Sequence, residues 1–272
     1  MDSPQVCRVN DHNLTYFRAG QGETVLLVHG ITTYSFLWQD IFPELAKNYD
    51  VIAFDLLGCG ASDMPLDVSY SLSAHAERLK IFVDQLSIDR LHLVGHDLGG
   101  GIAQIFAVNH PDMLYDLTLI NSVGYDFWPV QPITALRTPI IRQILMATMD
   151  IGAFKILISR GTFHKELVTE ELMEQFYLPL QSSLGRKAFM HFARCLDNHN
   201  LTEITEELKQ LKLPVLIIRG DADPYLSAEI AERLHEDIPG SRLVRVAEAS
   251  HFIQVDDPER VNRELLNFLA RD

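Results

Sequence analysis

The sequence predicts an α/β fold in which helices cover a mostly parallel β-sheet. Short apolar runs of strand length alternate along the chain with segments of helical periodicity, and this alternation indicates β-α-β units. Residues 125–210 interrupt it, because their apolar positions follow helical spacing and no strand signal recurs there. We therefore expect an α/β core formed by residues 1–124 and 211–272, with a helical cap inserted at residues 125–210.

Each expected element has its own local signal. The run TVLLV at residues 24–28 is apolar throughout, as in a strand buried on both faces of a sheet. Pro43 either lies inside the helix expected at residues 37–48 or restarts it. We expect strands at residues 6–10, 14–19, 24–28, 49–54, 91–94, 114–120, 214–219 and 242–246. The other expected helices cover residues 71–86, 102–107, 227–237 and 258–270.

Charge and composition make several kinds of partner and compartment less favourable. The formal net charge of -14 disfavours nucleic acids and anionic membranes, which bind basic patches. Cys7, Cys59 and Cys195 have neither disulfide nor metal-site spacing, which favours a reducing compartment. The N-terminus lacks the basic and apolar blocks of a signal peptide, and charged residues interrupt the apolar stretch 140–158. We expect a cytoplasmic protein without a metal or cofactor, whose partner is a small-molecule substrate; no oligomeric state is predicted.

Residues 95–100, with the sequence GHDLGG, stand between an apolar strand and a helix. A strand, a tight turn framed by glycines and a helix form the setting of a nucleophile elbow, usually written G-x-S-x-G. Such a turn exposes its central side chain at the edge of the sheet. Here the central residue is Asp97 instead of a serine, so the sequence predicts a carboxylate nucleophile.

Three further signals follow strands where an elbow needs partners. Asp221 and Asp223 come after the last strand but one, and His251 comes after the last strand. The chain order of nucleophile, acid and histidine is that of α/β-hydrolases. The residues His-Gly-Ile at 29–31 follow the third expected strand, where that fold places its second oxyanion donor. The joint occurrence of these signals predicts a hydrolase-type site.

Two stretches resemble motifs of the α/β-hydrolase superfamily, to which the chain is similar over nearly its whole length. Residues 29–38 (HGITTYSFLW) resemble the haloalkane dehalogenase segment HGNPTSSYLW. Residues 55–65 (DLLGCGASDMP) resemble that family's D-L-I-G-x-G-x-S-D-x-P. Together with Asp97, the resemblance points to the branch with an aspartate nucleophile, which contains haloalkane dehalogenases, fluoroacetate-type dehalogenases and epoxide hydrolases.

The sequence departs from both family patterns at the positions that bind the leaving group. Ile31 and Leu98 stand where dehalogenases have the asparagine and the tryptophan that bind halide. Thr32 replaces the proline of the epoxide hydrolase motif H-G-x-P. Tyr177 is one candidate for the pair of cap tyrosines in epoxide hydrolases, and no second is assigned. The leaving group therefore stays open between a halide and an epoxide oxygen.

An aspartate at the elbow favours attack on saturated carbon. Its reference pKa of about 3.9 leaves Asp97 ionised near neutral pH without help from a base. Attack on an ester carbonyl would give an anhydride, which stores energy, whereas attack on a carbon bearing halide, or on an epoxide carbon, gives an ester that water opens. We predict that His251, oriented by Asp223, activates this water, and that the backbone N–H groups of Ile31 and Leu98 stabilise the oxyanion.

Further residues receive roles from the resemblance or from their position. The family pattern places the acid at Asp223, three residues after Gly220, with Asp126 as the alternative found in some dehalogenases. We expect Asp55 to close the turn after its strand and His96 to pack beneath the elbow. Candidates for contact with the substrate or leaving group are Trp38, Trp128, His164, Tyr177 and His191. Candidates for an apolar cap pocket are Ile140, Ile144, Leu145, Met146 and Ile156.

Three functions compete on these residues. The first is a dehalogenase-like hydrolase that acts on a small organohalide through an alkyl ester on Asp97. The second is an epoxide hydrolase, which forms a diol through an ester on the same residue. The third is a non-catalytic ligand-binding protein on a hydrolase scaffold, in which no such ester forms. The intact set of aspartate, histidine and acid favours the two enzymes.

Overall fold

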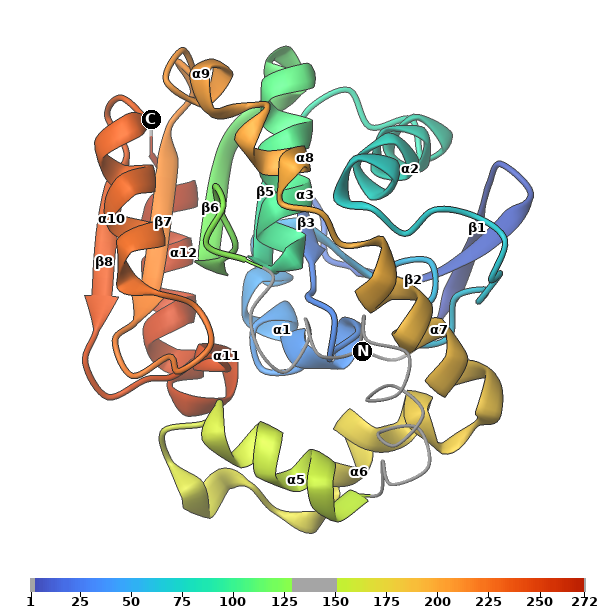
Figure 1. Cartoon of the computed structure of the whole chain (residues 1–272). Helices are drawn as coiled ribbons and strands as arrows, with labels where there is room; N and C mark the ends of the chain where they lie inside the picture. Colours follow the sequence, from blue (N-terminus) through green and yellow to red (C-terminus); the bar gives the residue numbers. More distant parts are fainter. Residues whose placement is uncertain (1–2, 129–150, 272) are drawn as a thin grey trace.

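The structure, a computed structural model, describes residues 3–128 and 151–271. Its described part contains an eight-stranded sheet in the order β1-β2-β4-β3-β5-β6-β7-β8, with helices on both faces (Figure 1). β1 and β2, and β2 and β4, pair antiparallel; every other neighbouring pair is parallel. The strands are β1 Gln5–Val9, β2 His12–Ala19, β3 Thr24–Val28, β4 Asp50–Phe54, β5 Leu91–Asp97, β6 Leu114–Ser122, β7 Val215–Gly220 and β8 Arg242–Val246.

Each strand coincides with an expected apolar run, and the predicted fold class is confirmed. β5 and β6 extend further than expected at their carboxyl ends. They do so because their backbones keep pairing beyond the apolar residues, as far as Asp97 opposite Ser122. The residue at the centre of the elbow is therefore the last residue of a central strand.

The helices follow the expected pattern with one correction. The helix expected at residues 37–48 is two short pieces, η1 Ser35–Trp38 and α1 Phe42–Leu45. Pro43 lies in the first turn of α1, where its missing N–H costs nothing, so the proline starts a new helix. The remaining core helices are α2 Leu72–Gln85, α3 Leu98–Asn109, η2 Pro111–Met113, α10 Ala228–Asp237, α11 Ile253–Asp256 and α12 Pro258–Leu269.

Two apolar cores lie on opposite faces of the sheet because side chains alternate along each strand. In β3, Leu26 and Val28 belong to one core and Val25 and Leu27 to the other. The first core contains apolar residues of α2, α3 and α10, and the second contains those of α1 and α12. This double cover explains why the central strands read as continuous apolar runs.

Helices occupy the described part of the insertion between β6 and β7. They are α5 Ile151–Arg160, η4 Lys165–Leu167, α6 Glu170–Tyr177, η5 Leu178–Gln181, α7 Ser183–Cys195, α8 His199–Thr202 and α9 Thr205–Leu208. Figure 1 shows α5 and α6 beyond the edge toward which β6 and β8 point. Within the described ranges, no helix is both long and apolar enough to cross a membrane.

Of the five candidates for an apolar cap pocket, only Ile156 lies among the described residues. The candidates Ile140, Ile144, Leu145 and Met146 lie outside the described residues. The prediction for Ile156 is wrong, because 65% of this residue is exposed on α5. Ile156 lies in a helix, as the periodicity predicted, but the periodicity did not say whether it faces the core.

The chain order of the strands reverses between β3 and β5. β3 has β4 on one side and β5 on the other, all three parallel. In open α/β sheets, ligands bind outside the carboxyl ends of the strands at such a switch point. Ile31, just after β3, and Asp97, at the end of β5, both lie at this place.

Candidate active site

Asp97 occupies a strained turn between β5 and α3. Its backbone has φ 54 and ψ -120, a conformation that is costly for a residue with a side chain. Two glycines let the strand, the turn and the helix come together. A Cβ on Gly95 would lie 2.4 Å from the carbonyl oxygen of Gly99, and one on Gly99 would lie 2.2 Å from that of Val28. The G-x-D-x-G spacing is therefore a steric requirement of this turn.

The Asp97 carboxylate is buried against two backbone N–H groups. The N–H of Ile31 donates to Oδ2 at 3.2 Å, and a Cβ on Gly30 would lie only 2.3 Å from the same oxygen. Burial raises the pKa of Asp97 above its ordinary value, while His251 and the N–H groups of Leu98 and Ile31 oppose this rise. Both predicted oxyanion donors thus act on the carboxyl group of the predicted nucleophile.

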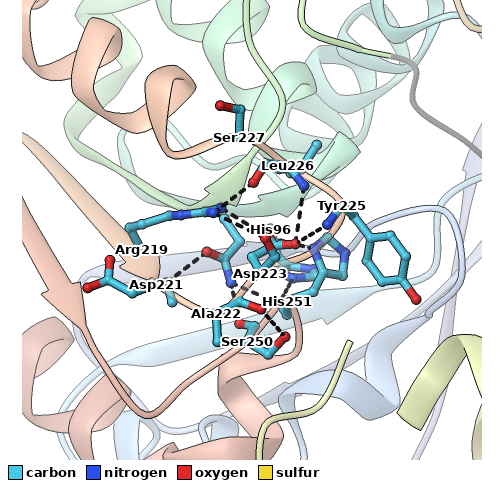
Figure 2. A network of polar contacts seen from close by, with 12 residues as sticks. His96, Arg219, Asp221, Ala222, Asp223, Tyr225, Leu226, Ser227, Ser250 and His251 are labelled. Atoms are coloured by element: carbon cyan, nitrogen blue, oxygen red, sulfur yellow. Dashed lines mark hydrogen bonds and ion pairs between the residues drawn. The ribbon is translucent and has the colours of Figure 1, made fainter. Parts of the chain in front are cut away.

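His251 is joined to Asp223 by a buried hydrogen bond. Its Nδ1 lies 2.9 Å from Asp223 Oδ2, and the second oxygen, Oδ1, accepts from the N–H groups of Tyr225 at 2.8 Å and Leu226 at 3.2 Å (Figure 2). Because a carboxylate only accepts, Nδ1 of His251 carries the hydrogen and Nε2 is the free basic nitrogen. This hydrogen bond therefore fixes the orientation of the imidazole.

The two other carboxylates weighed as the acid lie elsewhere. Asp221 is exposed and accepts a hydrogen bond from Arg245 at 2.8 Å. Asp126, the alternative acid, is exposed as well. Asp223 is thus the one of the three that the structure joins to His251. Asp223 lies in the connection between β7 and α10.

Arg219 is a buried charge that the sequence reading missed. Its guanidinium donates to Asp223 Oδ2 at 3.2 Å and to the carbonyl oxygen of Leu226 at 2.7 Å (Figure 2). Burial alone would raise the pKa of Asp223, but His251 and Arg219 lower it below its ordinary value. The signal was present in the sequence, since a basic residue in the apolar strand VLIIRG needs a buried partner.

The pKa of His251 is raised despite its burial. Burial by itself lowers this pKa, but the carboxylates of Asp223 and Asp97 more than compensate. Two negative groups facing one imidazole favour its protonated form. The neighbouring His96 behaves in the opposite way, because burial and His251 lower its pKa to about 3. The two neighbouring imidazoles are therefore shifted in opposite directions, His96 toward its neutral form and His251 toward its protonated form.

The backbone of His251 is held from two central strands. His96, beneath the elbow as expected, has its Nε2 2.9 Å from the carbonyl oxygen of His251. Asn121, near the end of β6, donates to the same oxygen at 2.9 Å and to the carbonyl oxygen of Ser250 at 2.8 Å. Its side-chain oxygen accepts from the N–H of Gly220 at 2.9 Å. Asn121 has no motif around it, and the sequence reading missed it.

Asp55 closes the turn after β4, as expected. Its two carboxylate oxygens accept from the N–H groups of Ser35 and Ala61, each at 2.8 Å. His29 braces the neighbouring loop, since its Nε2 accepts from the N–H of Leu56 at 2.9 Å. Its Nδ1 lies 2.7 Å from the carbonyl oxygen of Gly30. These contacts fix the loop that presents the N–H of Ile31.

Three candidates for leaving-group contact have other partners. Trp38 is fully buried in the second core, on the face of the sheet occupied by α1 and α12. His191 has Nε2 2.7 Å from the carbonyl oxygen of Val68. His164 lies beside Glu166, with 3.5 Å between Nδ1 and Oε1. The predicted contact is wrong for Trp38, which packs inside the second core. It is unsupported for His191 and His164, whose side chains contact neighbouring protein groups.

The other two candidates belong to the first core. Trp128 is 2% exposed there, and its indole N–H has no partner among the described residues. Tyr177 packs partly buried against the same core, with its ring centroid 6.1 Å from that of Phe154. Ile31 and Leu98 belong to this core too. Trp128 and Tyr177 therefore stay predictions.

A small pocket lies between the loops after β3 and β4 and the helices of the insertion. Its volume is about 20 Å³. The lining residues are Ile31, Thr32, Thr33, Gly58, Cys59, Gly60, Phe154, Phe176, Pro179, Leu180, Gly185, Phe189 and Phe192. No charged side chain occurs among them, so the pocket suits an apolar ligand. In the described ranges, no group of three or more His, Cys, Asp or Glu is arranged to hold a metal ion.

Comparison with known proteins places the chain among hydrolases. A family model described as alpha/beta hydrolase fold matches residues 23–142. An uncharacterised protein of Mycobacterium tuberculosis is 30% identical over 93% of this chain and 76% of its own length. Epoxide hydrolase 4 of Mus musculus is 28% identical over 97% of this chain and 79% of its own.

Solved structures agree with these matches. A mutant of the meta-cleavage product hydrolase from Pseudomonas fluorescens IP01 superposes with a TM-score of 0.86 at 25% identity, covering 97% of both chains. The ancestral haloalkane dehalogenase AncHLD2 superposes with a TM-score of 0.85 at 26% identity, covering 98% of both chains. These relatives share one fold but carry different activities in their names, so the substrate has to be argued from the site.

Proposed function

The chain belongs to the α/β-hydrolase superfamily, and we propose that it is a hydrolase whose nucleophile is the carboxylate of Asp97. The observation that carries the proposal is the 3.2 Å contact between the N–H of Ile31 and Oδ2 of Asp97. This donor sits on the carboxyl group itself, where negative charge would develop if water attacked an ester of Asp97. A donor in that position suits an intermediate carried by the enzyme.

In the first step, the Asp97 carboxylate attacks a saturated carbon that bears a leaving group. A bond forms between the carboxylate oxygen and this carbon, and the leaving group departs with its bonding electron pair. The product is an alkyl ester of Asp97. His251 takes no proton in this step, because an ionised carboxylate needs no base to attack.

In the second step, Nε2 of His251 removes a proton from water, and the oxygen of this water attacks the carboxyl carbon of Asp97. The charge on the carboxyl oxygen is stabilised by the N–H groups of Ile31 and Leu98. Collapse breaks the ester bond, and the departing alkoxide takes the proton from His251. Asp97 is left as a carboxylic acid, which releases its proton to solvent and is ionised again. Asp223 stabilises the imidazolium that exists between the two proton transfers.

We infer that residues 125–210 act as a cap over this site and that the substrate is a small apolar organohalide. The phenylalanine-rich pocket supports an apolar substrate, since its lining combines α5 to α7 with the loop that carries Ile31. One of the similar structures is named a haloalkane dehalogenase. An epoxide is the second candidate, because the mouse relative is named an epoxide hydrolase. A ligand-binding protein would leave Asp97 unmodified.

The test uses a His251→Gln variant, in which the second step is blocked. The variant is incubated separately with 1-bromobutane and 1,2-epoxybutane, and its mass and peptide map are measured. A butyl ester on Asp97 supports a dehalogenase, and a hydroxybutyl ester supports an epoxide hydrolase. An Asp97→Asn variant is the control and should stay unmodified. Absence of an adduct with members of both substrate classes would overturn the proposed nucleophile.

A further inference from the structure

The loop that carries His251 is held on both sides of the histidine, once by α11 and once by the insertion. The N–H of Ser250 donates to Oδ2 of Asp256 at 2.8 Å. The N–H of Phe252 donates to the carbonyl oxygen of Gly161 at 2.9 Å. Asp256 is the last residue of α11, whereas Gly161 follows α5 in the insertion. The backbone on either side of the imidazole therefore has a fixed external partner.

Asp256 also reaches the insertion directly. Its Oδ1 accepts from the N–H of Phe163 at 2.7 Å and from the N–H of His164 at 3.1 Å. One carboxylate, 8% exposed, thus binds three backbone donors from two segments of the chain. A carboxylate suits this place because both of its oxygens only accept. An asparagine would turn an NH₂ group toward one of the two segments.

Gly161 extends the connection to the rings that flank His251. A Cβ on Gly161 would lie 2.7 Å from Cε2 of Phe252 and 2.9 Å from Cε2 of Tyr225. The centroids of these two rings lie 4.9 Å and 5.3 Å from that of the His251 imidazole. The hydroxyl of Tyr225 donates to the carbonyl oxygen of Leu157, in α5, at 2.5 Å. The segment after α5 therefore packs against both aromatic neighbours of the histidine.

We propose that Asp256 is a positioning residue for His251: it fixes the histidine loop against residues 161–164 of the insertion, so that ester hydrolysis depends on this contact. The inference rests on the proposed function. It assigns Asp256 to the second step alone, because only that step uses His251 as a base. Attack by Asp97 on the substrate needs neither the imidazole nor the loop that holds it.

The experiment follows both steps in an Asp256→Asn variant by quenched-flow mass spectrometry with 1-bromobutane and 1,2-epoxybutane. Formation of the Asp97 ester should stay within about twofold of the parent rate, and its hydrolysis should slow by about tenfold or more. The ester should therefore accumulate. The matched control is Asp221→Asn, which removes an equal charge from an exposed position and should leave both rates unchanged.

A second variant, Gly161→Ala, tests the same contact between the histidine loop and the insertion without changing Asp256. Gly161→Ala keeps Asp256 but displaces Phe252 or Tyr225, and it should slow ester hydrolysis with the same sparing of ester formation. Ester hydrolysis at the parent rate in folded Asp256→Asn overturns the inference, as does an equal loss of both rates. Failure of His251→Gln to form any adduct overturns the proposed function itself, and this outcome is distinguishable because it does not involve Asp256.

Discussion

Arg219 and His251 bind the same oxygen of Asp223. The guanidinium of Arg219 lies 3.2 Å from Oδ2 and Nδ1 of His251 lies 2.9 Å from it. Asp223 is thus shared between a permanent cation and a group that gains and loses a proton. The ion pair keeps the carboxylate charged and in place, and its positive end lowers the pKa of His251.

An Arg219→Met variant tests this relationship. We expect a loss of about 3 kcal/mol in the free energy of unfolding, because one partner of a buried pair is removed. We also expect the pKa of His251 to rise further, since a nearby positive charge disappears. Urea unfolding and the pH dependence of ester hydrolysis measure the two effects. Arg245→Met, at a half-exposed pair with Asp221, should change neither by much.

The two chemical steps should have different pH dependences. Ester hydrolysis needs neutral His251, so its rate should rise with pH through the pKa of His251, which Asp223 still raises in the ester although Asp97 no longer carries a charge there. Ester formation needs ionised Asp97, so its rate should rise through a pKa above 3.8. Single-turnover rates are measured by rapid quench over about five pH units, from pH 4 to 9. They separate the pH dependence of ester formation from that of ester hydrolysis.

An Asp223→Asn variant tests the direction in which Asp223 shifts the pKa of His251. Removing this carboxylate removes the largest contribution that raises the pKa of His251. The limb for ester hydrolysis should then move to lower pH, while the maximal rate falls because the imidazole loses its orienting partner. A limb that stays in place would show that His251 is not the base for this step.

Isotope labelling tests whether water attacks the enzyme or the substrate. In a single turnover in H₂¹⁸O, the proposed mechanism puts ¹⁸O into the Asp97 carboxylate, because water attacks its carboxyl carbon. The released alcohol should then contain ordinary oxygen from the enzyme. Mass spectrometry of the Asp97 peptide and of the product measures both. Label that appears only in the product would mean that Asp97 acts as a base for direct attack of water.

The central strands were predictable because burial on both faces leaves an uninterrupted apolar run, as in Leu26 and Leu27. The helix after β3 was not, because Pro43 permits either continuation or a new start in a sequence pattern. Trp38 was misplaced as a candidate for substrate contact, because its residue type does not tell on which face of the sheet it packs, and it lies in the second core.

Asp97, Asp223 and His251 could be proposed from the sequence because each follows a strand in a recognisable order. Asn121 and Asp256 were missed because they bind partners from distant parts of the chain, whereas Arg219 was overlooked although its partners Asp223 and Leu226 are close in sequence. Asn121 binds the carbonyl oxygen of Ser250, 129 positions away, and Asp256 binds the N–H of Phe163. Such contacts leave no local spacing to read. They become visible only when the carboxyl ends of the strands are assembled.

Asn121 gives a last prediction about how the histidine loop is held. Its side chain satisfies the carbonyl oxygens of Ser250 and His251 and the N–H of Gly220, all of them buried contacts. Asn121→Ala would leave these groups without their partner and place alanine at φ 38, so we expect a loss of about 3 kcal/mol in the free energy of unfolding.

The same variant should slow ester hydrolysis more than ester formation, because the carbonyl that anchors His251 loses a donor from β6 while Asp97 keeps its own contacts. Urea unfolding and quenched single turnovers measure the two effects in one preparation. Asn48→Ala, at an exposed position, serves as the control and should match the parent in both. Equal slowing of the two steps in Asn121→Ala would mean that Asn121 supports the whole edge of the sheet and not the histidine loop in particular.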